Sequence, residues 1–136
     1  MALSCRSRLG IAFAFTLTSA SCARPNLDTR LRQLAGPGAI DCGFVAPGDN
    51  AAAANACSVT AFQGGAPFFV RYKVLGIDSR IERGYVRAAD GRLLLLLYDS
   101  DVTGGGSLLA KPKLIELPCA GQVIQRTPGI DRFVCG

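Results

Sequence analysis

Hydrophobic and polar residues alternate in the middle of the chain. Every second position from 68 to 74 is apolar: Phe68, Val70, Tyr72 and Val74. This period of two predicts a strand with one buried face. Further strands are predicted over 80–89 and 92–98, joined by a tight turn at Asp90-Gly91. Residues 92–98 contain a run of leucines, which indicates a central strand that is covered on both faces.

A helical pattern precedes these strands. Residues 51–62 are rich in alanine, the strongest helix former, and Asp49 or Asn50 can cap their N-terminal end. Gly64-Gly65 ends the pattern. The small side chains of this helix would let a sheet approach it closely.

Residues 22–39 have two interpretations. Leu27, Leu31 and Leu34 stand at helical spacing, and Gly36-Pro37-Gly38 would end such a turn of helix. The same residues also fit a mobile linker with a few apolar side chains. In both cases we expect residues 22–39 to act as a tether and the folded domain to cover 40–136.

The C-terminal part of the chain contains shorter apolar segments. Residues 114–119 and 123–126 are predicted to form a hairpin around Ala120-Gly121, and 132–135 a short edge piece. Together with the earlier elements, this predicts an α+β fold with one helix packed on an antiparallel meander sheet of about four to five strands.

The first residues have the pattern of a secretory signal peptide. Arg6 and Arg8 are followed by an apolar stretch over 9–17 and then by small residues. The apolar stretch is shorter than the roughly 18–20 residues of a permanent transmembrane helix. We therefore predict a signal peptide over residues 1–21.

Two cleavage sites are compatible with this signal. Ser19-Ala20-Ser21-Cys22 resembles a lipobox, in which cleavage precedes a lipidated cysteine, although Ser19 stands where leucine is preferred. Lipidation of Cys22 would hold the protein at the periplasmic side of the outer membrane through several acyl chains. The alternative is ordinary cleavage after Ala23, which would leave a soluble periplasmic protein.

The cysteines agree with export. After loss of Cys5 and use of Cys22, four remain, an even number that predicts two disulfides in an oxidising compartment. Three connectivities are possible, and sequence proximity favours Cys42–Cys57 with Cys119–Cys135. The chain has no histidine and no Cys-x-x-Cys spacing, so we expect no metal site formed by these residues.

Charge and composition narrow the classes of partner. The net charge of +5 falls to +3 when Arg6 and Arg8 leave with the signal peptide. This net positive charge is too small to indicate a protein that binds nucleic acid. Aromatic residues are also not interleaved with the cations, as binding of single-stranded nucleic acid would require. A net charge of +3 is compatible with attraction to anionic lipid or glycan surfaces.

Several short motifs resemble small bacterial envelope lipoproteins with two disulfides. The motifs are Cys42-Gly43, Ala56-Cys57, Gly65-Ala66-Pro67-Phe68, Gly76-Ile77-Asp78-Ser79, Tyr98-Asp99-Ser100-Asp101, Gly104-Gly105, Cys119 and Cys135. The resemblance covers most of residues 42–136. It implies a location in the cell envelope, and it implies no activity, because none is assigned to that family.

The sequence contains no clear set of catalytic residues. Without histidine, no Ser-His or Cys-His nucleophilic pair can form. Carboxylates are present, but nothing in the sequence places two of them across a cleft as glycosidic chemistry would need. We expect a protein that is not an enzyme and needs no cofactor.

One loop has the composition of a ligand site. Asp99 and Asp101 precede three glycines, as at the start of a calcium loop, and Asp78 could approach them. The twelfth position of such a loop should be glutamate and is Ala110. The simpler interpretation is a structural loop whose carboxylates cap backbone amides.

A group of cations accompanies the predicted strands. Arg71, Lys73, Arg83 and Arg87 are candidates for a face that binds an anionic partner, or else for the solvated side of the sheet. Two functions remain open. One is a non-catalytic envelope lipoprotein that binds or scaffolds an envelope protein, and the other is a small-ligand or ion-binding periplasmic module of an inhibitor-like kind.

Overall fold

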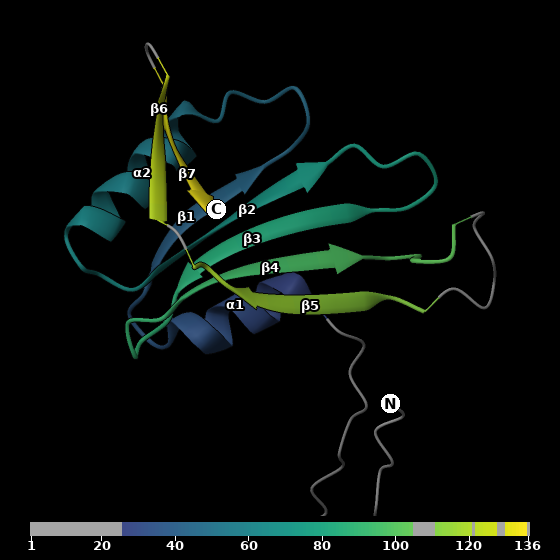
Figure 1. Cartoon of the computed structure of the whole chain (residues 1–136), viewed down its shortest axis with the longest axis horizontal. Coiled ribbons are helices and arrows are strands. Elements are labelled where there is room, and N and C mark those ends of the chain that lie inside the picture. The colour runs from purple at the N-terminus through teal and green to yellow at the C-terminus, as the bar shows by residue number, and fades with distance from the viewer. Residues whose placement is uncertain (1–25, 105–110, 121, 128–129, 136) are drawn as a thin grey trace, which may run out of the picture.

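The computed structural model describes residues 26–104, 111–120, 122–127 and 130–135 (Figure 1). They form two helices, a five-stranded sheet and a separate two-stranded sheet. In chain order the elements are α1 (Leu27–Ala35), β1 (Ile40–Val45), α2 (Ala52–Gln63), β2 (Phe68–Val74), β3 (Ile81–Arg87), β4 (Leu93–Asp99), β5 (Lys113–Pro118), β6 (Gln122–Thr127) and β7 (Ile130–Cys135). The predicted α+β class is confirmed. The signal peptide and Cys22 lie outside the described residues.

The large sheet has the order β1-β2-β3-β4-β5. Strands β2 to β5 form the predicted antiparallel meander. The expectation of a purely antiparallel sheet is wrong at one edge, because β1 pairs with β2 in parallel and α2 makes the crossover between them. Strand β1 was not predicted. Its register shifts between Asp41 and Phe44, and Gly43 between them has a φ of 92°, so the period of two is interrupted.

The sheet is covered by two helices instead of the single predicted one, one on each face (Figure 1). Of the two interpretations of residues 22–39, the helix is the one observed. The Asn26 side chain accepts a hydrogen bond from the Thr29 amide (3.3 Å), and Gly36 follows the last turn. Leu27, Leu31 and Ala35 are buried against the sheet, so α1 belongs to the folded unit.

Helix α2 begins after Asn50, whose side chain accepts a hydrogen bond from the Ala52 amide (2.9 Å). Its buried positions are small or polar: Ala54, Asn55, Ser58, Val59 and Ala61. Neither helix is long and apolar enough to cross a membrane, as judged over the described part of the chain.

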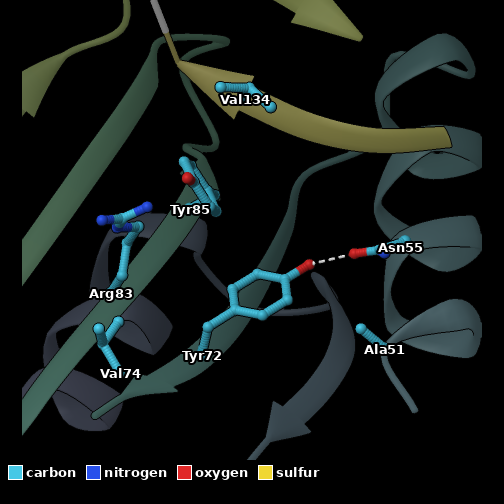
Figure 2. A pocket seen from close by; sticks show the side chains of 7 residues that line it. All are labelled: Ala51, Asn55, Tyr72, Val74, Arg83, Tyr85 and Val134. Atoms are coloured by element: carbon cyan, nitrogen blue, oxygen red, sulfur yellow. Dashed lines mark hydrogen bonds between the residues drawn. The ribbon is translucent and has the colours of Figure 1, made fainter. Parts of the chain in front are cut away.

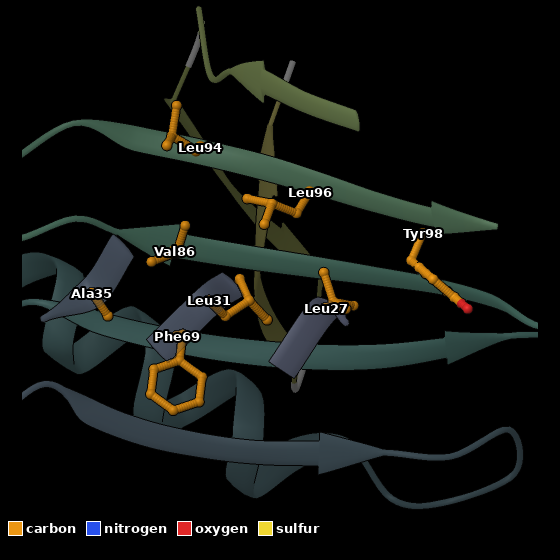
Figure 3. Close-up of a cluster of buried hydrophobic side chains, with 8 residues drawn as sticks. All are labelled: Leu27, Leu31, Ala35, Phe69, Val86, Leu94, Leu96 and Tyr98. Atoms are coloured by element: carbon orange, nitrogen blue, oxygen red, sulfur yellow. The ribbon is translucent and has the colours of Figure 1, made fainter. Parts of the chain in front are cut away.

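Strand β4 confirms the prediction that its leucines face both ways. Leu94, Leu96 and Tyr98 point to the α1 side, where they meet Phe69 and Val86 (Figure 3). The other core cluster contains Leu93 and lies on the α2 side, together with Phe68, Val70 and Tyr85.

Gly84 lets α1 lie close to the centre of β3. A Cβ atom at position 84 would lie 2.7 Å from Cδ1 of Leu31 and 3.3 Å from Cδ1 of Leu27. Leu31 is fully buried, so its side chain has little room to move away.

The C-terminal strands differ from the predicted hairpin. Strand β5 pairs with β4, and β6 pairs with β7 in the second sheet. The error arose because β5 and β6 are close in sequence, whereas β5 finds its apolar neighbours on β4.

Both predicted disulfides are present. Cys42–Cys57 joins β1 to α2, with a Cα–Cα distance of 5.5 Å, and Cys119–Cys135 joins the end of β5 to the end of β7, with 5.1 Å. Each closes a loop of 15 or 16 residues, which corresponds to about 3 kcal/mol in a chain-entropy treatment. The second bridge also holds the small sheet near α2, against which β7 packs.

The contact at Gly84 gives a testable prediction. Gly84→Ala should lower the free energy of unfolding by about 1–3 kcal/mol, because the added methyl group overfills the space under α1. Denaturant unfolding under non-reducing conditions measures the change. The loss should be smaller in a Leu31→Ala background, where room is available. Equal losses in both backgrounds would show that Leu31 is not the obstacle.

Candidate functional site

An open pocket lies between the start of α2, the sheet and β7 (Figure 2). Its volume is about 320 Å³, which is at the lower end of the range for small-molecule sites. The lining residues are Ala51, Asn55, Tyr72, Val74, Arg83, Tyr85 and Val134. Their side chains come from α2, β2, β3 and β7, so the pocket depends on the complete fold.

A partly buried hydrogen bond forms the inner wall. The Tyr72 hydroxyl donates to Oδ1 of Asn55 over 2.7 Å, from β2 to α2 (Figure 2). Asn55 is only 5% exposed, and a buried amide of this kind needs such a partner. The ring of Tyr85 meets that of Tyr72 edge to face, with 6.0 Å between centroids. Asn55 and Tyr72 therefore have fixed positions before any ligand arrives.

The surroundings of Tyr72 change its acidity. Burial raises the pKa of Tyr72 from 10.0 to about 12, the nearby Tyr85 adds to the rise, and hydrogen bonding with Ser58 opposes it. The phenol is therefore neutral at physiological pH and acts as a hydrogen-bonding group, not as a base.

Arg83 supplies the positive charge at the pocket. It is paired with Tyr72 in the β2–β3 register, so both side chains lie on the α2 face. The guanidinium is solvent-exposed and offers several N–H donors. Phenol, amide and guanidinium groups on apolar walls can hold a small polar or anionic group. The lining set contains no nucleophile paired with a base.

Sequence reasoning did not find this pocket. The sequence predicts Arg83 as part of a charged face, and it predicts Asn55 and Tyr72 only as parts of a helix and a strand. The available signal was a single Asn among the alanines of the predicted helix, at a position that the helix buries.

The predicted ligand loop is organised by hydrogen bonds within the loop. Oδ1 of Asp99 accepts from the Asp101 amide (2.9 Å), and Oδ1 of Asp101 accepts from the amide (3.1 Å) and hydroxyl (2.7 Å) of Thr103. Asp78 is exposed in the β2–β3 turn. The two segments do meet, because Arg80 donates its amide proton to Oγ of Ser100 (2.8 Å). Within the described residues, no group of three or more Cys, Asp or Glu side chains could hold a metal ion.

The four cations predicted as one anionic-partner face do not lie together. Arg71 and Lys73 alternate with Tyr72, so they lie on the α1 face, whereas Arg83 and Arg87 lie on the α2 face. Two of them have structural contacts. Arg71 lies 3.4 Å from Asp28 and over the ring of Phe44, and Arg87 donates to the Phe62 carbonyl at the end of α2 (3.2 Å). Arg83 and Lys73 remain exposed, on opposite sides of the sheet.

Comparison with protein-family models, curated proteins and solved structures gave no match for this chain.

The organisation of the Asp99–Asp101 loop leads to a prediction. Asp101→Asn keeps an oxygen that can accept from Thr103, so the free energy of unfolding should fall by no more than about 1 kcal/mol. Calcium should leave the Tm of both proteins unchanged, which a thermal melt with and without the ion will measure. A calcium-dependent rise in the wild type that is absent in Asp101→Asn would instead establish an ion site.

A second prediction concerns pH. Between pH 10 and 12 the unfolded phenol releases its proton, while folded Tyr72 retains it up to a pKa of about 12. The contribution of Tyr72 to stability is therefore complete below pH 10 and is lost as the pH rises to 12. The free energy of unfolding should decrease less over this interval in Tyr72→Phe than in the wild type. Identical slopes would show that Tyr72 ionises normally in the folded state.

Proposed function

We propose that this chain is an exported protein of the bacterial cell envelope, anchored through a lipid on Cys22, whose folded domain binds an envelope partner without catalysis. The observation that carries the proposal is the pairing of all four cysteines of the described part in two disulfides. Such bridges persist in oxidising compartments and are rare in the bacterial cytosol. The signal-like N-terminus supports the same location.

The pocket supports binding more than catalysis. Its polar groups are a neutral phenol, an amide and a guanidinium, and the chain contains no histidine that could act as a base near neutral pH. A side chain of a partner protein, or an anionic glycan or lipid group, would find both apolar walls and hydrogen-bond donors there. Membrane-bound location on the periplasmic side of the outer membrane follows from lipidation of Cys22. Ordinary cleavage would give a soluble periplasmic protein with the same binding domain.

The pocket also favours a second candidate function, a periplasmic module that binds a free small ligand. Its volume is sufficient for a compact molecule, and Asn55 and Tyr72 are already fixed by their mutual hydrogen bond. A ligand in contact with the Tyr72 hydroxyl would alter the ultraviolet titration of that phenol, so the titration distinguishes this function from binding a protein partner elsewhere on the domain.

The anchoring proposal predicts the behaviour of Cys22→Ser. Wild-type protein should fractionate with membranes, and its intact mass should show a chain that starts at Cys22 and carries acyl groups. Cys22→Ser should remain unprocessed or appear in the soluble periplasmic fraction. Ala20→Gly, which keeps a small residue before the cysteine, is the matched control and should behave like the wild type. A wild-type chain that starts at Arg24 without acyl mass would refute lipidation and leave the soluble alternative.

A further inference from the structure

The β2–β3 turn carries two large apolar side chains in solvent. Leu75 is 82% exposed and Ile77 is 100% exposed. Turn residues are usually small or polar, so two aliphatic side chains within three positions are unusual for a turn. Transfer of both from water to an apolar environment would be favourable.

The turn is held in place by its base. The Arg80 carbonyl accepts from the Ser100 amide, and the Arg80 amide donates to Oγ of Ser100. The Arg80 guanidinium lies 5.2 Å from the ring centroid of Tyr98 and 3.2 Å from the Glu82 carboxylate. A side chain at position 76 would collide with the Ser79 carbonyl, so the turn is tightly closed there. Ile77 therefore projects from a fixed support at one end of the sheet.

Helix α1 begins at this same end of the sheet. Its C-terminal end lies beside the end of β3, where the Ala89 amide donates to the Leu34 carbonyl (3.2 Å). Its first residue, Leu27, lies toward the Tyr98 end of β4, whereas Ala35 lies toward the Leu94 end (Figure 3). The start of α1 and the β2–β3 turn thus share one end of the domain.

The start of α1 limits how far the folded domain can lie from a lipid on Cys22. Leu27 follows Cys22 by only five residues, which span at most about 18 Å when fully extended. A lipid on Cys22 would therefore keep the start of α1, and the end of the sheet that carries Leu75 and Ile77, near the membrane surface.

Exposed charges at this end favour an anionic surface. The described cations around the turn and the adjoining ends of β3 and β5 are Lys73, Arg80, Arg83, Lys111 and Lys113. The exposed carboxylates at the same end are Asp49 and Asp78. Asp28, Glu82 and Asp99 are partly exposed there, with Asp28 paired to Arg71 and Glu82 to Arg80, and Asp101 is buried. Aliphatic side chains surrounded by lysine and arginine are typical of segments that enter the headgroup region of anionic bilayers.

We infer that Leu75 and Ile77 form a membrane contact, in which the β2–β3 turn enters the interface of an anionic bilayer and fixes the orientation of the domain. This inference rests on the proposed anchor at Cys22. The contact turns the end with the β2–β3 turn toward the bilayer and the opposite end, with the C-terminus of α2, away from it.

A single tryptophan tests the contact, because the chain contains none. Ile77→Trp places the probe in the turn, and its exposed site should tolerate the larger side chain. Gln63→Trp is the control, at the exposed last residue of α2 near Arg87 and thus at the other end of the sheet. The mature proteins are purified from membranes and reconstituted into phosphatidylglycerol–phosphatidylethanolamine vesicles, with or without brominated acyl chains.

The expected result is a blue-shifted emission that brominated lipid quenches at position 77, with no quenching at position 63. Quenching should weaken in neutral phosphatidylcholine vesicles, because the lysine and arginine side chains have no anionic headgroups to contact there. A blue shift at position 77 without quenching would indicate burial against protein, including a second copy, and would overturn the inference. Equal quenching at both positions, or none at position 77, would also overturn it.

Intact mass of the same preparations separates this inference from the anchor. Acylated protein without quenching at position 77 would leave the anchor valid and refute the membrane contact. Protein without acyl groups that still binds anionic vesicles and is quenched at position 77 would refute the anchor and retain the contact.

Discussion

The central strands of the large sheet carry apolar side chains on both faces, and this requires a cover on each side. On one side α1 supplies Leu27 and Leu31, and the missing side chain at Gly84 lets these leucines lie close to β3. On the other side α2 presents mainly small residues and is tied to β1 by Cys42–Cys57. Removing α1 would expose Leu94 and Leu96 of β4 to water, which costs roughly 25 cal/mol for each Å² of apolar surface.

The two-sided sheet also determines where the charges and the pocket lie. Neighbouring residues of a strand point to opposite faces, and the register places Arg83 opposite Tyr72, so Arg71 and Arg83 are separated by the sheet. The pocket forms on the α2 side because Ala51 and Asn55 at the start of that helix leave space over Tyr72 and Tyr85. Strand β7 closes one side of this space through Val134, and the Cys119–Cys135 bridge holds the end of that strand.

Local signals explain which parts of the fold were predictable. The helix over 51–62 follows from the helix propensity of alanine, and the strands around Asp90-Gly91 follow from the turn chemistry of that pair. Both disulfides join cysteines that are close in sequence. Strand β1 was missed because the bulge at Gly43 interrupts its alternation, and the predicted hairpin of β5 with β6 was wrong because β6 pairs with β7 in a separate sheet. The candidate site was largely unpredictable, because Asn55 and Tyr72 meet only after α2 has crossed from β1 to β2.

Helix α1 connects the fold to the proposed location. The sequence allowed residues 22–39 to be a free tether, but burial of Leu27 and Leu31 leaves only the residues before α1 for that role. Detaching the nine residues of α1 would lengthen the tether by roughly 30 Å in extended form. It would also expose two leucines that are almost fully buried, at about 1.5–3 kcal/mol each. A total cost of about 3–6 kcal/mol makes the long tether a minor state, because each step of about 1.4 kcal/mol changes an equilibrium tenfold. An anchored domain would therefore remain close to the bilayer, with little freedom to turn its other end toward it.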